Sequence, residues 1–139
     1  MQKIVVDTNV FVSALIQTAY PYLIINELFI EGKIELCISD EVMQEYYEVL
    51  NRKKFSRYPD FLLKAEMLLA NIEAQASKFA PKTKLNIIGD IGDNKFLELA
   101  FESKSKFLIT GNTNDLTIAS YKKTRIVTPK DYWEKFKPA

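Results

Sequence analysis

Lys3-Ile4-Val5-Val6-Asp7-Thr8-Asn9 is the stretch that decides the fold. Ile4, Val5 and Val6 form an uninterrupted apolar run, which is typical of a strand buried on both faces of a parallel sheet. An acid follows the run at once. Ligands of open α/β sheets bind beyond the carboxyl ends of the strands, so we expect Asp7 to stand at the mouth of that crevice. A single Asp after a strand is more often a helix cap or a turn residue, and the interpretation therefore depends on residues later in the chain.

The composition limits the number of domains and the kinds of catalytic chemistry that are possible. With 139 residues the chain is long enough to bury a substantial core, and we expect a single domain over residues 1–139. The net charge of +1 gives no global basic field that would indicate nucleic-acid binding, but it leaves room for a local basic patch. The chain has no histidine, which excludes Ser-His and Cys-His hydrolases, imidazole bases and most zinc sites. A metal ion here must be a hard cation bound by oxygen.

The single cysteine and the amino terminus both favour a cytoplasmic protein. Cys37 excludes an internal disulfide and lies in the apolar run 34–38, so we expect a buried core thiol rather than a nucleophile. The amino terminus lacks the basic segment and the long apolar core of a signal peptide. No run approaches the roughly 20 apolar residues that cross a bilayer.

Apolar periodicity predicts strands that alternate with helices. We expect buried strands at 4–6, 34–38, 107–109 and 125–127, and a short edge strand within 74–79. Helices are expected at 10–16, 21–31, 40–50, 59–72, 90–103 and from 129 onward. In the helix at 90–103 we expect Phe96, Leu97, Ala100 and Phe101 to pack inward. This alternation indicates an α/β fold, with a central parallel sheet of four to five strands flanked by helices.

Four oxygen-bearing side chains fall at comparable places along this pattern. Asp7 follows the first strand, Glu45 lies on a helix, Asp93 begins a helix, and Asn112 follows another strand. Each also has a simpler explanation: Glu45 shares a solvated helix face with Glu41 and Glu48, Asp90 and Asp93 suit a helix amino terminus, and Asn112 and Asp115 suit a turn. Taken singly, none of these residues identifies a site.

The order of the motifs is more informative. Asp7-Thr8-Asn9 comes first, then Ser39-Asp40-Glu41-Val42-Met43-Gln44-Glu45-Tyr46, then Asp90-Ile91-Gly92-Asp93-Asn94-Lys95-Phe96-Leu97-Glu98-Leu99-Ala100, and last Thr110-Gly111-Asn112-Thr113-Asn114-Asp115. This order resembles the PIN-domain nucleases, in particular the VapC-like toxins of bacterial and archaeal toxin–antitoxin pairs, over nearly the whole chain. The resemblance implies a Rossmann-like fold and a Mg²⁺- or Mn²⁺-dependent endoribonuclease that cleaves single-stranded RNA. It also implies a homodimer and a small antitoxin protein as partner.

The resemblance further assigns residues to the site. It implies that Asp7, Glu45 and Asp93 bind the metal and that Asn112 is the fourth catalytic position. Many family members have Asp where this chain has Asn112, which offers an oxygen but no charge. This departure either weakens a second metal site or leaves Asp90 or Asp115 to supply the charge. The remaining supporting positions are Thr8, Asn9, Ser13 and Thr110.

A cluster of carboxylates suits this chemistry. Carboxylates that lie close together repel, so one pKa rises unless a cation neutralises them. Mg²⁺ or Mn²⁺ would bind a few carboxylates and keep several waters, one of which could attack the phosphorus. None of these steps needs a histidine, in agreement with the composition.

Two groups of cations are candidates for contacting the RNA. Arg52, Lys53, Lys54 and Arg57 are interleaved with aromatic residues, a pattern that suits single-stranded nucleic acid. A solvated helix exit explains this segment slightly better. Lys95 follows Asp93 within one helical turn and is the nearer candidate.

Two other functions stay open at this point. The chain would be a catalytically impaired PIN-like module that binds RNA or protein, if Asn112 disables the site. A receiver-like or phosphatase-like protein would use one Asp as phosphoacceptor. It needs a lysine after the penultimate strand or a second acid two residues beyond Asp7, but Thr110-Gly111-Asn112 contains no lysine and the second place is taken by Asn9.

Overall fold

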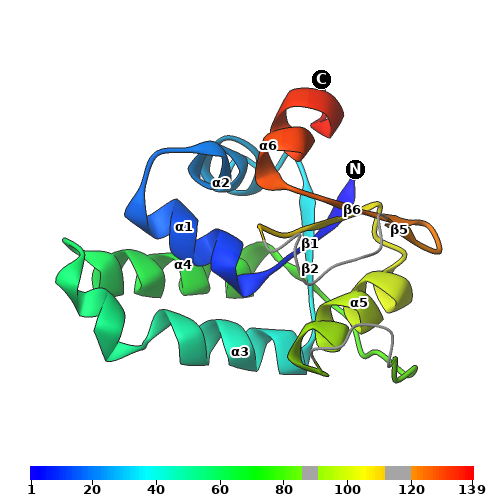
Figure 1. Cartoon of the computed structure of the whole chain (residues 1–139), viewed down its shortest axis with the longest axis horizontal. Coiled ribbons are helices and arrows are strands. Elements are labelled where there is room, and N and C mark those ends of the chain that lie inside the picture. The colour runs from blue at the N-terminus through cyan, green and yellow to red at the C-terminus, as the bar shows by residue number, and fades with distance from the viewer. Residues whose placement is uncertain (86–90, 112–119) are drawn as a thin grey trace.

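A mostly parallel six-stranded sheet forms the centre of this computed structural model (Figure 1). The structure describes residues 1–85, 91–111 and 120–139, and of residues 91–93 it describes the backbone alone. The strand order is β3-β2-β1-β4-β6-β5. The strands are β1 (Lys3–Val6), β2 (Glu35–Ile38), β3 (Ser77–Lys78), β4 (Phe107–Ile109), β5 (Ser120–Tyr121) and β6 (Thr124–Val127).

Helices cover the sheet on two sides. They are α1 (Thr8–Ile16), α2 (Tyr20–Leu23), η1 (Ile24–Phe29), α3 (Asp40–Leu50), η2 (Lys53–Arg57), α4 (Phe61–Gln75), α5 (Ile91–Ser103), α6 (Pro129–Asp131) and η3 (Tyr132–Phe136). In Figure 1 the sheet lies between α2 and α6 on one side and α3 and α5 on the other. The two termini meet, because Gln2 Nε2 donates to the Phe136 carbonyl at 2.9 Å and Tyr132 Oη donates to Gln2 Oε1 at 2.6 Å.

The α/β class expected from the sequence is confirmed. The strands at 107–109 and 125–127, and the edge strand within 74–79, form as expected. The sheet has six described strands rather than four to five, because the two residues of β5 pair antiparallel with β6 as a hairpin. A two-residue strand carries no periodicity that a sequence could reveal.

The region expected as one helix over 21–31 differs in detail. It is divided between α2 and η1, and η1 is a π-helix. The last helix likewise continues from α6 into the π-helical η3. A π-helix uses i→i+5 hydrogen bonds, and the periodicity of such short segments does not distinguish it from an α-helix.

The central strand β1 lies in the middle of the core. Ile4, Val5 and Val6 are all 0% exposed. Strand β1 pairs with β2 on one side and β4 on the other, with Val5 opposite Leu108. Cys37 on β2 is buried as expected. One expected core residue is not buried: Phe101 in the last turn of α5 is 38% exposed and faces the β5–β6 hairpin rather than the sheet.

No single described helix is long and apolar enough to cross a membrane. The pair Thr8–Ile16 and Tyr20–Phe29 has sufficient combined length and apolar composition, but it is bent by 99°.

Candidate active site

Asp7 stands where β1 leaves the sheet. Its backbone N–H still donates to Ile109 O at 2.9 Å, so the residue is fixed by the sheet, and it is also the N-cap of α1. The side chain is only 8% exposed. Thr110, the residue after β4, donates from Oγ1 to Asp7 Oδ2 at 2.8 Å. The carboxyl ends of two neighbouring parallel strands therefore position this carboxylate, as the sheet rule predicts.

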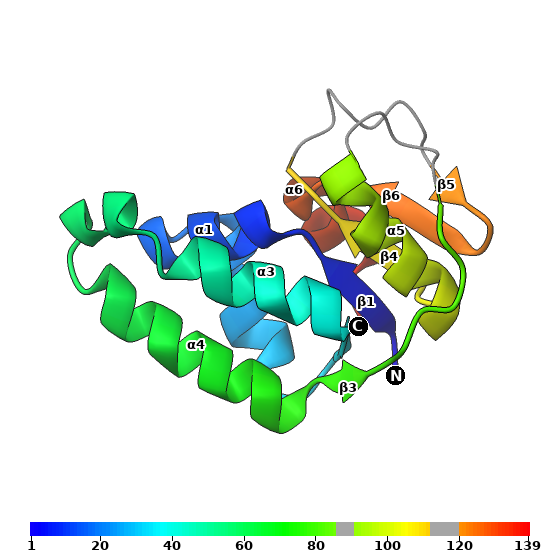
Figure 2. The same cartoon turned by 90° about the horizontal axis from the view of Figure 1, so that it is seen from below.

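Glu45 is the second carboxylate at this place. It lies on α3, and two side chains hold it: Thr8 Oγ1 donates to Oε2, and Lys95 Nζ of α5 lies 2.8 Å from Oε1. The other two glutamates of this helix face point elsewhere, since Glu41 pairs with Lys84 and Glu48 pairs with Arg52. The contacts thus separate Glu45 from Glu41, which periodicity could not do. Figure 2 shows α3 and α5 on either side of the junction of β1 and α1.

Burial and mutual repulsion act on this pair. Burial raises the pKa of the Asp7 carboxyl, and the nearby charge of Glu45 raises it further. The Thr110 hydroxyl and the backbone N–H groups of Asn9 and Thr8 act in the opposite direction. The net effect is a raised pKa, so this carboxyl group holds its proton more readily than an exposed aspartate. Lys95, the described cation of this site, pairs with Glu45 instead.

Tyr46 fixes the helix that carries Glu45. Its side chain is 0% exposed, its hydroxyl donates to the Val6 carbonyl, and its ring meets Phe11 edge-on at 4.8 Å between centroids. Burial raises the pKa of this phenol well above its usual range, so it remains a neutral donor. The sequence pattern includes Tyr46 in the motif around Glu45 but assigns no contact to its hydroxyl. Its hydroxyl contact depends on how α3 packs on β1, which no sequence signal reveals.

Part of the expected constellation lies outside the described residues. Asp90, Asn112 and Asp115 are not among them, and of Asp93 only the backbone at the start of α5 is described. Within the part of the chain that is described, no group of three or more Asp, Glu, His or Cys side chains is arranged to hold a metal ion. The two described carboxylates, Asp7 and Glu45, are hard oxygen donors next to each other, and this donor set fits Mg²⁺ or Mn²⁺.

The remaining candidates fall into three places. Thr8 and Thr110 contact the two acids directly. Asn9 and Ser13 instead line a neighbouring hollow of about 320 Å³ beside Gly111 and Pro129. The basic group Arg52, Lys53, Lys54 and Arg57 lies on and before η2, beyond the end of α3, and has no described contact with either acid. The structure therefore brings Lys95 to the acids but not this group.

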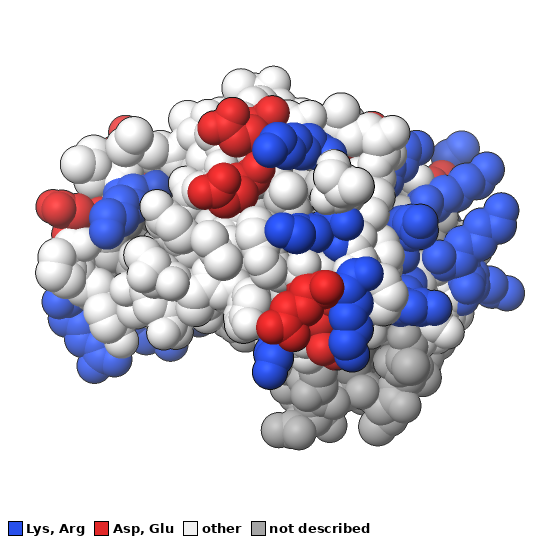
Figure 3. All heavy atoms as spheres, turned by 90° about the horizontal axis from the view of Figure 1, so that it is seen from above, with Lys and Arg blue, Asp and Glu red and all other residues white. Residues whose placement is uncertain are grey.

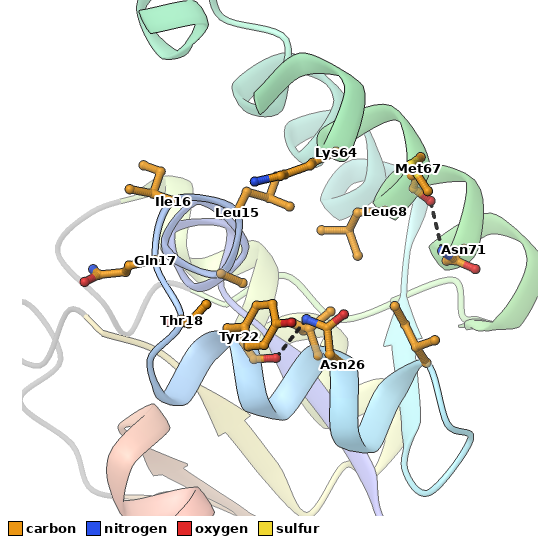
Figure 4. A pocket seen from close by; sticks show the side chains of 13 residues that line it. Leu15, Ile16, Gln17, Thr18, Tyr22, Asn26, Lys64, Met67, Leu68 and Asn71 are labelled. Carbon is orange, nitrogen blue, oxygen red and sulfur yellow. Dashed lines mark hydrogen bonds between the residues drawn. The ribbon is translucent and has the colours of Figure 1, made fainter. Parts of the chain in front are cut away.

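A groove of apolar character lies away from the acids. It has a volume of about 550 Å³ and runs between the end of α1, the pair α2 and η1, and α4 (Figure 4). Its walls are mostly apolar, with Leu15, Ile16, Met67 and Leu68 among the side chains that face it. Polar side chains at its edge bond within their own helices, as Asn71 Nδ2 does to the Met67 carbonyl at 3.1 Å. The groove lacks acids and is not part of the carboxylate site.

Comparison with known proteins agrees with the fold and with the order of the motifs. The family profile of the PIN domain matches residues 3–114. An uncharacterized protein of Methanocaldococcus jannaschii is 30% identical over 143 residues, covering 96% of this chain and 91% of its own. A chain in the crystal structure of VapBC2 from Rickettsia felis, bound to a DNA fragment from their promoter, has a similar fold. It gives a TM-score of 0.59 at 17% identity and covers 91% of this chain and 98% of its own.

The fold is an α/β sheet with a buried acid directly after its central strand, and the family profile matches residues 3–114 of the chain. Together these observations define the class of protein. The chain belongs to the PIN-domain family, and its fold is similar to that of a chain in the VapBC2 structure.

Proposed function

We propose that the chain is a metal-dependent endoribonuclease that hydrolyses phosphodiester bonds of single-stranded RNA. The observation that carries the proposal is the pair of adjacent carboxylates, Asp7 and Glu45, held by separate partners at the carboxyl edge of a PIN-domain sheet. Two buried or half-buried acids that repel each other lower the stability of the folded state unless a bound ligand neutralises their charge. A divalent cation is the ligand that this donor chemistry selects.

We assign the roles of Asp7, Glu45, Thr8, Thr110 and Lys95 from their contacts, and those of the other residues from the family resemblance. Asp7 and Glu45 would hold Mg²⁺ or Mn²⁺ together with Asp93, with Asn112 at the fourth position and Asp90 or Asp115 adding charge. When bound, the cation supplies an acidified water for attack at phosphorus and stabilises the charge on the leaving oxygen. Thr110 keeps Asp7 Oδ2 in place, while Thr8 and Lys95 orient the two oxygens of Glu45.

The test is cleavage of an end-labelled single-stranded RNA with Mg²⁺, Mn²⁺ or EDTA. We expect cleavage that requires metal and that falls by roughly a hundredfold or more in Asp7→Asn, because the variant loses a charged ligand. Asp60→Asn is the matched control. Asp60 is an exposed acid before α4 with φ of 57°, a conformation that Asn also adopts readily, and it lies outside the site.

Three results would contradict or redirect the proposal. Equal cleavage by wild type and Asp7→Asn would indicate a contaminating nuclease. Loss of activity in Asp60→Asn as well would indicate a nonspecific effect of charge. RNA binding without cleavage by wild type would favour the alternative of a catalytically impaired PIN-like binding module.

We also propose that the protein is the toxin of a toxin–antitoxin pair, that it forms a homodimer, and that a small antitoxin protein inhibits it. The likeness to the VapBC2 structure supports this partner, and the apolar groove between α1, α2, η1 and α4 offers a surface for an apolar segment of it. On α4 beside this groove, Leu63 and Met67 are 59% and 60% exposed. Large apolar side chains at such exposure suit a surface that a partner covers.

A further inference from the structure

A second cationic surface lies at the opposite edge of the sheet from Asp7. We call it the hairpin patch, and its members come from the end of α5 and from the β5–β6 hairpin: Phe101, Lys104, Tyr121, Lys122 and Lys123. Figure 3 shows Lys and Arg side chains gathered at the end of the molecule where Figure 1 places this hairpin. The net charge of +1 conceals this local concentration.

The lysines of the patch take no part in the ion pairs of the described part of the chain. Lys104, Lys122 and Lys123 are exposed, and none of them forms an ion pair with a described acid. Glu102 is the acid next to them, but its Oε1 accepts a hydrogen bond from the Lys82 backbone N–H at 3.1 Å. Unpaired lysines in a group attract polyanions, and phosphate backbones are the commonest of these.

Two of these lysines stand where the backbone favours another residue. Lys104 directly follows α5 with φ of 56°, and Lys122 begins the two-residue turn of the hairpin with φ of 52°. Glycine is the usual residue at both kinds of position, because a side chain is strained in the left-handed region. The chain has Lys instead of Gly at both turns of one patch, which points to selection for charge rather than for stability.

Aromatic rings complete the surface. A hollow of about 380 Å³ lies between α5 and the hairpin, with Phe101 in its wall and the three lysines around it. The Phe101 ring is 38% exposed and meets Tyr121 at 6.1 Å between centroids, and Lys122 Nζ lies 5.9 Å from the centre of the Tyr121 ring. An exposed ring among cations is the combination that binds single-stranded nucleic acid, because bases stack on the ring while phosphates contact the charges.

Helix α5 connects this hollow with the acids. Lys95 near its start contacts Glu45, and Phe101 lies six residues later, about 9 Å along the helix axis. The segment before α5 runs alongside the helix (Figure 2), since Leu85 N–H donates to Glu98 and Lys82 N–H donates to Glu102. Lys82 and Lys84 on this segment are both exposed, but Lys84 pairs with Glu41 at 2.9 Å and with Glu98 at 3.8 Å, so Lys82 is the exposed cation that this segment adds between the acids and the hairpin patch.

We propose that the hairpin patch binds a nucleotide of single-stranded RNA beside the segment that is cleaved, with its base against Phe101 and its phosphates at Lys104, Lys122 and Lys123. The inference rests on the proposed ribonuclease function for the identity of the ligand. It adds an anchoring site remote from the acids. This site would determine which stretch of a bound RNA molecule reaches Asp7.

The test measures binding separately from cleavage. Fluorescence anisotropy of a labelled single-stranded RNA is recorded in EDTA at several salt concentrations, for wild type, the double variant Lys104→Gly with Lys122→Gly, and Phe101→Leu. We expect the double variant to weaken binding about tenfold or more and to lower the slope of log K against log salt by about 1.4, the loss of two phosphate contacts. We expect Phe101→Leu to weaken binding about fivefold or more, with the salt slope unchanged.

The fold itself supplies the control. Both glycine substitutions relieve left-handed strain, so the melting temperature of the double variant should equal or exceed that of wild type, and weaker binding cannot then be ascribed to misfolding. Lys33→Ser with Lys64→Ser removes the same number of charges at exposed positions outside the acids and the hairpin patch, and should leave affinity within about twofold of wild type.

Each outcome decides a separate question. If wild type binds RNA and the double variant binds equally well, the hairpin patch is not the site, whereas metal-dependent cleavage would still support the nuclease. If the variants lose binding but wild type does not cleave, the patch is supported and the nuclease is not. If polyglutamate competes as well as RNA and Phe101→Leu has no effect, the surface recognises any polyanion and the proposed nucleotide site is wrong.

Discussion

At the scale of single residues, the raised pKa of Asp7 makes the stability of the metal-free protein depend on pH. Burial and the charge of Glu45 raise the pKa above its ordinary value, so the folded state binds a proton more readily than the unfolded chain. The penalty for the ionised form is fully present above the folded-state pKa. It disappears as the pH falls through that value to the unfolded one, near 4.

Asp7→Asn should therefore be more stable than wild type at pH 7 in EDTA, since it removes the buried charge and keeps an oxygen for Thr110. The difference in melting temperature should shrink as the pH approaches 4, where wild type is protonated as well. Added Mn²⁺ should raise the melting temperature of wild type and leave the variant unchanged. Differential scanning fluorimetry measures all three effects, and a variant that is less stable than wild type in EDTA at pH 7 would contradict the electrostatic account.

Lys95 acts on the same site through Glu45. Its ammonium group pairs with Glu45 Oε1 at 2.8 Å, and both side chains are about three-quarters buried, at 24% and 23% exposure. A cation in contact with a metal-binding carboxylate competes with the metal for it. Lys95→Met should therefore raise the affinity for Mn²⁺ by about two- to fivefold, the size expected for a partly exposed ion pair.

Lys84→Met is the matched control for this experiment. Lys84 pairs with Glu41 at 2.9 Å, so the control changes the net charge equally but leaves Glu45 untouched. Calorimetric titration with Mn²⁺ compares the three proteins. If Lys95→Met abolished metal binding, as Asp7→Asn is expected to do, Lys95 would be required to hold Glu45 in place rather than a competitor for it.

At the scale of elements, the groove between α1, α2, η1 and α4 allows the proposed antitoxin contact to be tested within one helix. Met67 lines this groove, whereas Leu63 lies one turn earlier on α4 and does not, although the two are equally exposed. Met67→Lys should weaken the complex with the cognate antitoxin tenfold or more, because a charge in an apolar groove must be desolvated. Leu63→Lys should not, and neither change should alter RNA cleavage by the free protein.

Competition titrations with the purified antitoxin would measure these affinities. Equal loss of binding in both variants would indicate that the partner covers the outer face of α4 rather than the groove. Equal retention would place the partner on another surface of the molecule.

The elements also differ in how well the sequence predicts them. The strand at 107–109 forms as expected, because three apolar residues stand between polar ones. The helix expected at 40–50 likewise forms, and Ser39 is its N-cap, with Ser39 Oγ accepting from the Val42 N–H at 3.2 Å. The π-helical η1 and the two-residue β5 could not be predicted, since both depend on contacts made by distant segments. Phe101 keeps the helical period of α5, yet it faces the hairpin because β5 packs beyond the last turn.

At the scale of the whole molecule, the parallel arrangement of the strands explains why the part of the site around Asp7 could be predicted from the sequence. A residue that follows a strand must appear at the carboxyl edge of the sheet, so Asp7 and Thr110 could be placed together without coordinates. The partners of Glu45 depend instead on how α3 packs against α1 and α5, and no local pattern specifies that packing. Asp90, Asn112 and Asp115 lie outside the described residues, and their roles, like that of the Asp93 side chain, stay predictions.

The single thiol of the chain has a practical consequence for all of these comparisons. Cys37 lies on β2, next to the central strand, and is 0% exposed. Burial also raises the pKa of its thiol. Both the lack of access and the raised pKa slow its reaction with alkylating reagents in the folded protein. Alkylation then proceeds only through molecules whose sheet has opened. The labelling rate of one natural atom thus reports the opening free energy of wild type and variants in crude extract, without purification. A bound antitoxin, RNA or metal ion would each register as slower labelling of the same sulfur.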